Sequence, residues 1–353
     1  MTEQDCSQAL AETVAQAGRN RAPLRIIGSN SKGFYGRETQ GKALSMAGHV
    51  GIVGYEPTEL VLTARSGTPL TLIESALADQ EQMLPFEPPH FGPSATLGGA
   101  IACGLSGPRR PYIGAARDFV LGVTLLNGQA ERLRFGGQVM KNVAGYDVSR
   151  LMVGSMGTLG VLLEISLKIL PAPQSEITLA LEQEAEGAIK RMNALAARPL
   201  PLSATCHYQG ILYIRLSGTE TAVASAQKTI GGTMVDGSSL WQEIREHTHA
   251  FFLGPKPLWR LSLPSTTPPL ELPGTFLIDW GGAQRWLRAD VEAKVIRAAA
   301  ARNGGYATLF RGQKAGEEVF HPLNPTLLAL HRRLKAAFDP LGILNPGRMY
   351  REI

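Results

Sequence analysis

The sequence has few cysteines and no long apolar run. Its 353 residues include only Cys6, Cys103 and Cys206, which are far apart and form no CxxC pair. This spacing excludes a disulfide framework and a cysteine-based metal site, and it favours a reducing compartment. No apolar stretch approaches membrane-spanning length, and the acidic, polar start MTEQDCSQAL predicts no signal peptide. We expect a cytoplasmic protein that reaches a membrane only through partners.

The excess of positive over negative charge is also small. Lys and Arg number 35 against 30 Asp and Glu, which gives a formal net charge of +5. No run of cations is longer than the pairs Arg109-Arg110 and Arg332-Arg333. This mildly basic balance suits anionic small molecules and does not favour nucleic acid as a partner. A hydrophobic content of 44% is typical of a globular protein, and the length suits two domains.

Two common nucleotide-binding motifs are missing. The chain has no G-x-G-x-x-G, so a Rossmann site for NAD is not supported. The segment 36–43, GRETQGKA, is one residue short of a P-loop, and Ala43 stands where a Mg²⁺-binding Ser or Thr belongs. No spacing of ligands predicts a metal site, and no internal repeat is present.

Glycine is abundant between residues 135 and 171. A polar segment that ends in Asp147 precedes a short helix predicted over 148–152, which Asp147 or Ser149 can cap. The segment 154–160, GSMGTLG, then leads into a strand whose apolar residues alternate with polar ones up to Pro171. Such glycines are typical of tight turns with positive φ, or of backbone that lies against a flat or phosphorylated ligand.

Another glycine-containing segment follows the first predicted strand. Residues 24–27 are apolar and run directly into Gly28-Ser29-Asn30-Ser31-Lys32. A strand that ends in small hydroxyl and amide residues can form a nest of N–H donors suited to a diphosphate. The residue types alone favour a plain turn.

Several of these segments together resemble the PCMH-type FAD-binding domain of the vanillyl-alcohol-oxidase superfamily. The matching motifs are the loop at 28–33, TLGGAIA at 96–102, KNVAGYD at 141–147, GSMGTLG at 154–160 and FDPLGILNPG at 338–347. The resemblance implies an α+β fold, with a two-lobed FAD-binding domain and a smaller α+β cap-like domain on an antiparallel sheet. The cofactor-binding residues that it implies are Gly28, Ser29, Asn30, Ser31, Lys32, Thr96, Gly98, Gly99, Gly145, Tyr146, Asp147, Gly154, Ser155, Gly157, Thr158, Gly160 and Asn345.

The pattern of elements changes after Pro171-Ala172-Pro173. Strands and helices beyond this point predict an α+β layer on an antiparallel sheet. We therefore place the FAD-binding domain at 1–172 and the cap-like domain at 173–330. Residues 331–353 form a C-terminal segment that, by the resemblance, returns to the FAD-binding domain beside the flavin.

The whole chain is similar to the FAD-binding subunits of bacterial glycolate oxidases, for example over RIIGSNSKGFYGR at 25–37 and LIDWGGAQRW at 277–286. This similarity implies oxidation of glycolate and related 2-hydroxy acids such as D-lactate to 2-oxo acids. It also implies two partners, a larger FAD-linked subunit and an iron–sulfur subunit that passes electrons to a membrane quinone. Covalent flavin attachment in this superfamily often uses a histidine in the loop after the first strand. Since residues 28–32 contain none, we expect noncovalent FAD.

The substrate side is less defined by the sequence. A 2-hydroxy acid needs a cation for its carboxylate and a base for its hydroxyl proton, and the weak candidates are Arg109, Arg110 and His90. Surface charges and a structural histidine are the competing interpretations. His247 and His249 are expected to be solvated at a helix end.

Related hydroxy-acid dehydrogenases carry an H-x-G-D-G-N-x-H-like motif that this chain lacks. Three hypotheses follow. The first is an FAD-dependent subunit that takes part in hydroxy-acid oxidation. The second is a flavin-binding or degenerate scaffold subunit with the hydroxy-acid site on its partner. The third is an independent FAD-dependent alcohol oxidase.

Overall fold

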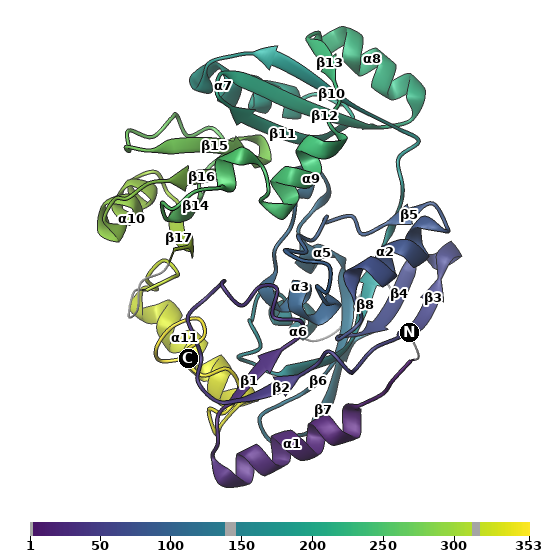
Figure 1. Cartoon of the computed structure of the whole chain (residues 1–353), viewed down its shortest axis with the longest axis vertical. Helices are drawn as coiled ribbons and strands as arrows, with labels where there is room; N and C mark the ends of the chain where they lie inside the picture. Colours follow the sequence, from purple (N-terminus) through teal and green to yellow (C-terminus); the bar gives the residue numbers. More distant parts are fainter. Residues whose placement is uncertain (1–2, 138–145, 313–317) are drawn as a thin grey trace. The chain divides into compact units, whose positions relative to one another are not determined.

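The computed structural model describes residues 3–137, 146–312 and 318–353. The chain forms two compact units (Figure 1). The first unit contains Met1–Ser106, Ala115–Ala172 and Pro322–Ile353, and the second contains Gly107–Gly114 and Pro173–His321. In the described part of the chain, no helix has both the length and the apolar character needed to cross a membrane.

The first unit is built on a five-stranded antiparallel sheet in the order β3-β4-β8-β6-β7. In β8, Leu163, Ile165 and Leu167 are fully buried and alternate with Glu164 and Ser166, which confirms the predicted alternation. The strands of this sheet are β3 (Ile52–Glu56), β4 (Val61–Arg65), β6 (Val120–Leu126), β7 (Arg132–Gly136) and β8 (Val161–Lys168).

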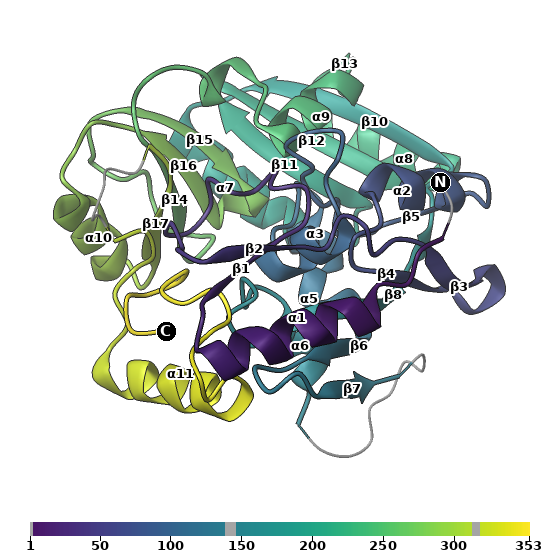
Figure 2. The same cartoon turned by 60° about the horizontal axis from the view of Figure 1, so that its bottom comes forward.

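A smaller part of the first unit joins both ends of the chain. Strands β1 (Leu24–Ile27) and β2 (Lys42–Ser45) form a parallel pair, and helix α1 (Ser7–Asn20) packs beside them (Figure 2). The C-terminal segment follows helix α11 (Pro325–Phe338) and returns to β1. Leu24 N donates to Ile343 O at 2.7 Å, so residues more than 300 positions apart share one core.

Short helices complete the first unit. They are α2 (Leu70–Ala78), α3 (Leu97–Cys103), α5 (Ala116–Phe119) and α6 (Val148–Met152), with η1 (Pro57–Glu59) and the paired strands β5 (Gln82–Met83) and β9 (Leu170–Pro171). Helix α6 begins at the predicted residue, and the Asp147 carboxylate caps it by accepting from Arg150 N at 3.1 Å.

The second unit contains an eight-stranded antiparallel sheet in the order β13-β10-β12-β11-β15-β16-β14-β17. Its strands are β10 (Ser175–Glu182), β11 (Leu202–Tyr208), β12 (Ile211–Gly218), β13 (Thr233–Val235), β14 (Leu258–Ser262), β15 (Thr275–Asp279), β16 (Gln284–Arg288) and β17 (Tyr306–Arg311). Helices α7 (Ala185–Ala196) and α8 (Glu220–Ile230) cover one half of the sheet, and α10 (Ala293–Arg302) covers the other. The prediction of an α+β chain with antiparallel sheets is confirmed.

The predicted solvation of His247 is wrong. His247 ends helix α9 (Ser238–Glu246) with a φ of 57° and is only 7% exposed. Its ring stacks on Phe252 with centroids 4.0 Å apart, and the Trp286 ring lies 4.6 Å away. Burial holds the pKa of His247 well below its usual value, and the nearby Arg311 and Arg260 lower it further. The positive φ at the end of α9 turns this side chain into the aromatic cluster, which a helical projection does not predict.

Candidate cofactor site

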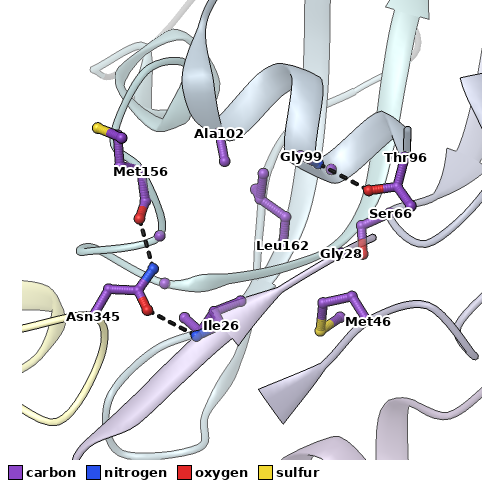
Figure 3. A pocket seen from close by; sticks show the side chains of 13 residues that line it. Ile26, Gly28, Met46, Ser66, Thr96, Gly99, Ala102, Met156, Leu162 and Asn345 are labelled. Atoms are coloured by element: carbon purple, nitrogen blue, oxygen red, sulfur yellow. Dashed lines mark hydrogen bonds between the residues drawn. The ribbon is translucent and has the colours of Figure 1, made fainter. Parts of the chain in front are cut away.

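A small cavity lies in the first unit where glycine-rich segments from distant parts of the sequence meet (Figure 3). Its volume is about 60 Å³, below the roughly 300–1,000 Å³ of whole-ligand pockets, so it can enclose only one part of a dinucleotide. The lining residues are Ile26, Gly28, Met46, Ser66, Thr96, Gly98, Gly99, Ala102, Met156, Gly157, Gly160, Leu162 and Asn345.

The end of β1 and the start of α3 touch at Gly28. A Cβ atom at this position would lie 2.2 Å from Thr96 Oγ1, so only glycine fits. The Thr96 hydroxyl caps α3 by accepting from Gly99 N at 3.3 Å. The absence of a side chain thus lets two backbone segments approach each other beside the cavity.

Asn345 connects three segments on the opposite side of the cavity. Its Oδ1 accepts from Ile26 N at 2.7 Å, and its Nδ2 donates to Met156 O at 2.7 Å (Figure 3). Gly157 has a φ of 71°, and a Cβ there would lie 2.7 Å from Asn345 Nδ2. The amide side chain therefore links the glycine-rich loop to the first strand.

Ser66 lines the cavity and carries a buried hydroxyl. The residue is 1% exposed, and among the described residues its Oγ has no hydrogen-bond partner. Buried polar atoms normally find a partner, so an unused hydroxyl at a cavity is a fit for a polar ligand group. Sequence reasoning missed Ser66, because a serine before Gly67 has no distinguishing pattern.

The loop after β1 offers further donors. Within the described part of the chain, the N–H groups of Ser29, Asn30 and Ser31 donate to no protein acceptor. Asn30 has a φ of 64°, a left-handed conformation of the kind found in anion-binding nests. Lys32 is buried and its Nζ donates to His90 O at 3.1 Å, so this lysine braces the loop.

Arg348, in the C-terminal segment, binds the same loop through hydrogen bonds. Its guanidinium donates to the carbonyl oxygens of Arg37 at 2.8 Å, Gly33 at 3.1 Å and Tyr35 at 2.5 Å. In return, Arg37 N donates to Arg348 O at 2.9 Å. Burial lowers the pKa of Arg348 from its usual value. Sequence reasoning missed this residue, although it directly follows the Asn-Pro-Gly of the C-terminal motif.

A buried ion pair shapes the turn that carries Asn345. Lys335 Nζ donates to Asp339 Oδ2 at 2.7 Å, and it also donates to the carbonyl oxygens of Thr158 and Leu344. The Asp339 carboxylate accepts from Ile343 N and Leu344 N. Burial lowers the pKa of Lys335, and Asp339 opposes that shift. The pair thereby links α11 to the glycine-rich loop through Thr158.

The described residues Tyr146, Asp147, Gly154, Ser155 and Thr158, which the motifs also predicted, do not line the cavity. Gly145 lies outside the described residues. Tyr146 is 96% exposed, and Asp147 caps α6 and pairs with Arg150 at 3.0 Å. The hydroxyl of Thr158 donates to Ser155 O at 2.7 Å within the loop. Gly154 has a φ of 81°, and a Cβ there would meet no atom of the described residues within 4 Å.

The three weak catalytic candidates all have partners within their own unit. Arg109 in the second unit donates to Glu176 Oε2 at 2.8 Å, and Arg110 lies 4.3 Å above the Trp280 ring. His90 in the first unit lies 3.0 Å from the Glu74 carboxylate.

The two arginines belong to the segment 107–114, which the second unit holds firmly. Tyr112 of helix α4 (Arg110–Ile113) lies 3.0 Å from Thr205 Oγ1, and its burial raises its pKa to about 12. Trp280 Nε1 donates to Gly107 O at 3.0 Å. Among the described residues, no group of three His, Cys, Asp or Glu side chains is arranged to bind a metal.

Comparisons with known proteins identify the family of the chain. Residues 5–136 match the family described as FAD binding domain, and residues 312–349 match the C-terminal domain of FAD linked oxidases. The chain is 52% identical to the glycolate oxidase subunit GlcE of Escherichia coli (strain K12), over 100% of both chains. It is 31% identical to a D-lactate dehydrogenase of Anaerostipes hadrus over 52% of this chain and 39% of that protein.

The fold is shared with a more distant enzyme. The solved structure of an alkyldihydroxyacetonephosphate synthase superposes with a TM-score of 0.65 over 96% of this chain and 75% of that one. The sequence identity is 14%, so this likeness concerns the fold alone.

Proposed function

Because the chain belongs to the family of the glycolate oxidase subunit GlcE, we propose that it is an FAD-binding subunit of an oxidase for 2-hydroxy acids. Glycolate and related acids such as D-lactate are the proposed substrates, and 2-oxo acids are the products. A larger FAD-linked subunit and an iron–sulfur subunit are the proposed partners. The subunit name of the full-length relative supports a multi-chain enzyme.

The observation that carries the proposal is the set of hydrogen-bond donors at the small cavity and in the loop after β1. Among the residues that the structure describes, the Ser66 hydroxyl and the N–H groups of Ser29, Asn30 and Ser31 donate to no protein acceptor. An FAD has polar ring atoms and a diphosphate that fit such donors. When bound, FAD supplies the electron-transfer chemistry, and the protein supplies binding and orientation.

This chain's residues then have defined tasks. Arg348 and Lys32 hold the backbone of the loop after β1, so its N–H groups stay oriented toward a diphosphate. Asn345 keeps Met156 and Gly157 beside β1, which closes the cavity on that side. Apolar lining from Ile26 and Leu162 limits water around the enclosed part of the cofactor.

A second candidate function concerns where the hydroxy acid is oxidised. Arg109 is paired with Glu176, and Arg110 stacks on Trp280, so both cations already have contacts inside the second unit. These contacts favour a role in which this chain carries flavin for electron transfer and the larger flavin subunit holds the hydroxy-acid site.

Spectroscopy of the purified chain tests the proposal. We expect the absorbance bands of oxidised flavin, and we expect acid precipitation to release all the flavin into the supernatant. A colourless chain that stays colourless after incubation with FAD would refute cofactor binding. Flavin that remains with the precipitate would refute noncovalent attachment. Glycolate turnover by the isolated chain, compared with the assembled complex, separates the two candidate functions and identifies an independent oxidase.

A further inference from the structure

The cavity of the first unit differs in polarity between its two ends (Figure 3). At one end lie the hydroxyl groups of Ser66 and Thr96, and at the other end lies the amide of Asn345. Both polar atoms of that amide already bond to the backbone of β1 and of the glycine-rich loop. The Ser66 side chain is buried, and its Oγ has no hydrogen-bond partner among the described residues. A ligand group in the cavity therefore meets an available hydroxyl at the Ser66 end.

The space between these two ends is apolar. The side chains of Ile26, Met46 and Leu162 line it, and Gly157 and Gly160 line it without a side chain. Every lining residue is buried or half-buried, so the space is partly closed to solvent. A flat, largely apolar ring fits such a space when its polar edge points toward the hydroxyl end.

The flavin ring system is a poor occupant of this cavity. Isoalloxazine has three fused rings, whereas the volume of the cavity is about 60 Å³. Its dimethylbenzene edge offers nothing to the Ser66 hydroxyl, and its pyrimidine edge carries several polar groups that would each need a partner. The flavin ring must also stay accessible to the groups that deliver and remove electrons. Adenine has only two rings and takes no part in electron transfer, so it can be enclosed.

The position of the cavity along the chain points to the same end of the cofactor. Gly28 lines the cavity and is bonded directly to Ser29, the first residue of the loop with available N–H groups. A diphosphate on that loop would therefore lie beside the cavity. In FAD a single ribose joins the diphosphate to adenine, whereas a longer ribityl chain joins it to the flavin ring. The shorter connection suits a ring that is enclosed next to the loop.

We propose that this cavity holds the adenine ring of FAD, and that Ser66 is a specificity-determining residue that donates its hydroxyl proton to a ring nitrogen of adenine. The inference rests on the proposed function, since it takes FAD as the cofactor. Ser66 thereby contributes to the selection of FAD over FMN, which has the flavin ring and a phosphate but no adenosine.

Titration of the apoprotein with FAD, ADP and FMN tests the role of Ser66. In Ser66→Ala, the affinities for FAD and ADP should fall about fivefold or more, because one hydrogen bond is lost. The FMN affinity should stay within about twofold of the wild type, since FMN has no adenine. The apoprotein itself should be no less stable, because Ser66 Oγ has no hydrogen bond to a described residue. Equal losses for ADP and FMN, or no loss for ADP, would overturn the proposal.

Ser166 provides the matched control. It is a buried serine of the same unit that does not line the cavity, and its Oγ lies 2.8 Å from Thr63 Oγ1. Ser166→Ala should lose stability with that hydrogen bond, but the folded variant should bind ADP like the wild type. If Ser166→Ala weakened ADP binding as much as Ser66→Ala does, the effect would come from stability and the proposal would be overturned.

The wild-type chain allows a test that needs no change at Ser66. Met46 lines the cavity, and an aromatic ring beside it would shift the NMR resonance of its isotope-labelled methyl group. ADP should shift this resonance, which Met46→Leu assigns, and riboflavin should not. A shift with riboflavin and none with ADP would place the flavin ring in the cavity and overturn the proposal.

The same measurements separate this inference from the proposed function. A chain that binds ADP with the expected dependence on Ser66 but never takes up FAD would refute the proposed function and support the adenine site. If Ser66→Ala took up FAD as tightly as the wild type, FAD binding would stand and the role of Ser66 would be overturned.

Discussion

The side chain of Asn345 accepts a hydrogen bond from Ile26 N at 2.7 Å, across 319 positions of sequence. The same amide donates to Met156 O at 2.7 Å. One group must therefore accept on one side and donate on the other, which an amide can do and a carboxylate cannot. This requirement explains why an asparagine occupies this position in the C-terminal motif.

We expect Asn345→Asp to destabilise the first unit and to weaken FAD binding. The carboxylate can still accept from Ile26 N, but it leaves Met156 O facing a second acceptor, which should cost about 1–3 kcal/mol of unfolding free energy. Denaturant unfolding and titration of the apoprotein with FAD measure both effects. Asn303→Asp is the control, since Asn303 Nδ2 donates to Ala299 O in the second unit. Equal losses in the two variants would contradict the prediction.

Valine at Gly157 or Gly154 should abolish FAD retention while the second unit stays folded. At Gly157 the new side chain would strike Asn345, and at both positions a positive φ adds a strain of about 1–3 kcal/mol. Gly154 separates a clash with the protein from the other effects, because a Cβ there lies within 4 Å of no atom in the part of the chain that the structure describes. Gly210 in the second unit has a similar φ of 78° and equally open surroundings, so Gly210→Val should keep a full flavin load. A full flavin load in Gly154→Val would show that this glycine only forms a turn.

Removal of the Arg348 guanidinium should weaken binding of the diphosphate part of FAD. Arg348→Ala leaves several loop carbonyls without their donor, and Arg348→Lys restores one charge without the planar fork. We expect the affinity for FAD and for ADP to fall at least tenfold in Arg348→Ala, with a smaller loss in Arg348→Lys. Riboflavin affinity should not change, since riboflavin lacks the diphosphate. Arg332→Ala is the control, and an equal loss of riboflavin binding would point to general unfolding.

Acid should destabilise the second unit through His247. The folded pKa is well below 6.5, so as the pH falls through 6.5 the unfolded chain takes up a proton that the folded chain does not. Stability from this residue is complete above pH 6.5 and declines below it, by about 1.4 kcal/mol per pH unit. His247→Phe keeps a ring against Phe252 and removes the titration. The loss of unfolding free energy between pH 7.5 and 5.5 should then be about 1 kcal/mol smaller than in the wild type.

Replacing Arg109 and Arg110 together by alanine should lower the stability of the second unit. The change removes the ion pair to Glu176 and the stacking on Trp280, which together fasten segment 107–114. The glycolate KM of the assembled complex should not change if the hydroxy-acid site is on the larger subunit. Steady-state kinetics and thermal unfolding of the reconstituted complex give both readouts. A KM raised tenfold or more with assembly intact would place the carboxylate site on these arginines.

The sequence by itself determined the elements whose information is local. Alternation of apolar and polar residues predicted β8, and an acidic residue before Val148 predicted the capped helix α6. Side-chain direction along a strand and N-cap chemistry depend on neighbours within a few residues, so a pattern is sufficient for both. The motifs likewise indicated an α+β flavoprotein fold.

Only the tertiary structure decided which distant groups meet. Thr68 is a residue type that often caps helices, but its Oγ1 exchanges hydrogen bonds with the backbone of Gly51, and α2 begins only at Leu70. Ser66 is a candidate ligand-binding residue because the fold packs it against Gly98 of the second flavin motif. Arg348 is one because the fold brings its guanidinium against the carbonyl oxygens of the loop at 32–37. Segment 107–114 joins the second unit through Arg109 and Tyr112. Such contacts depend on where the folded chain brings separate segments, and local propensity carries no information about that.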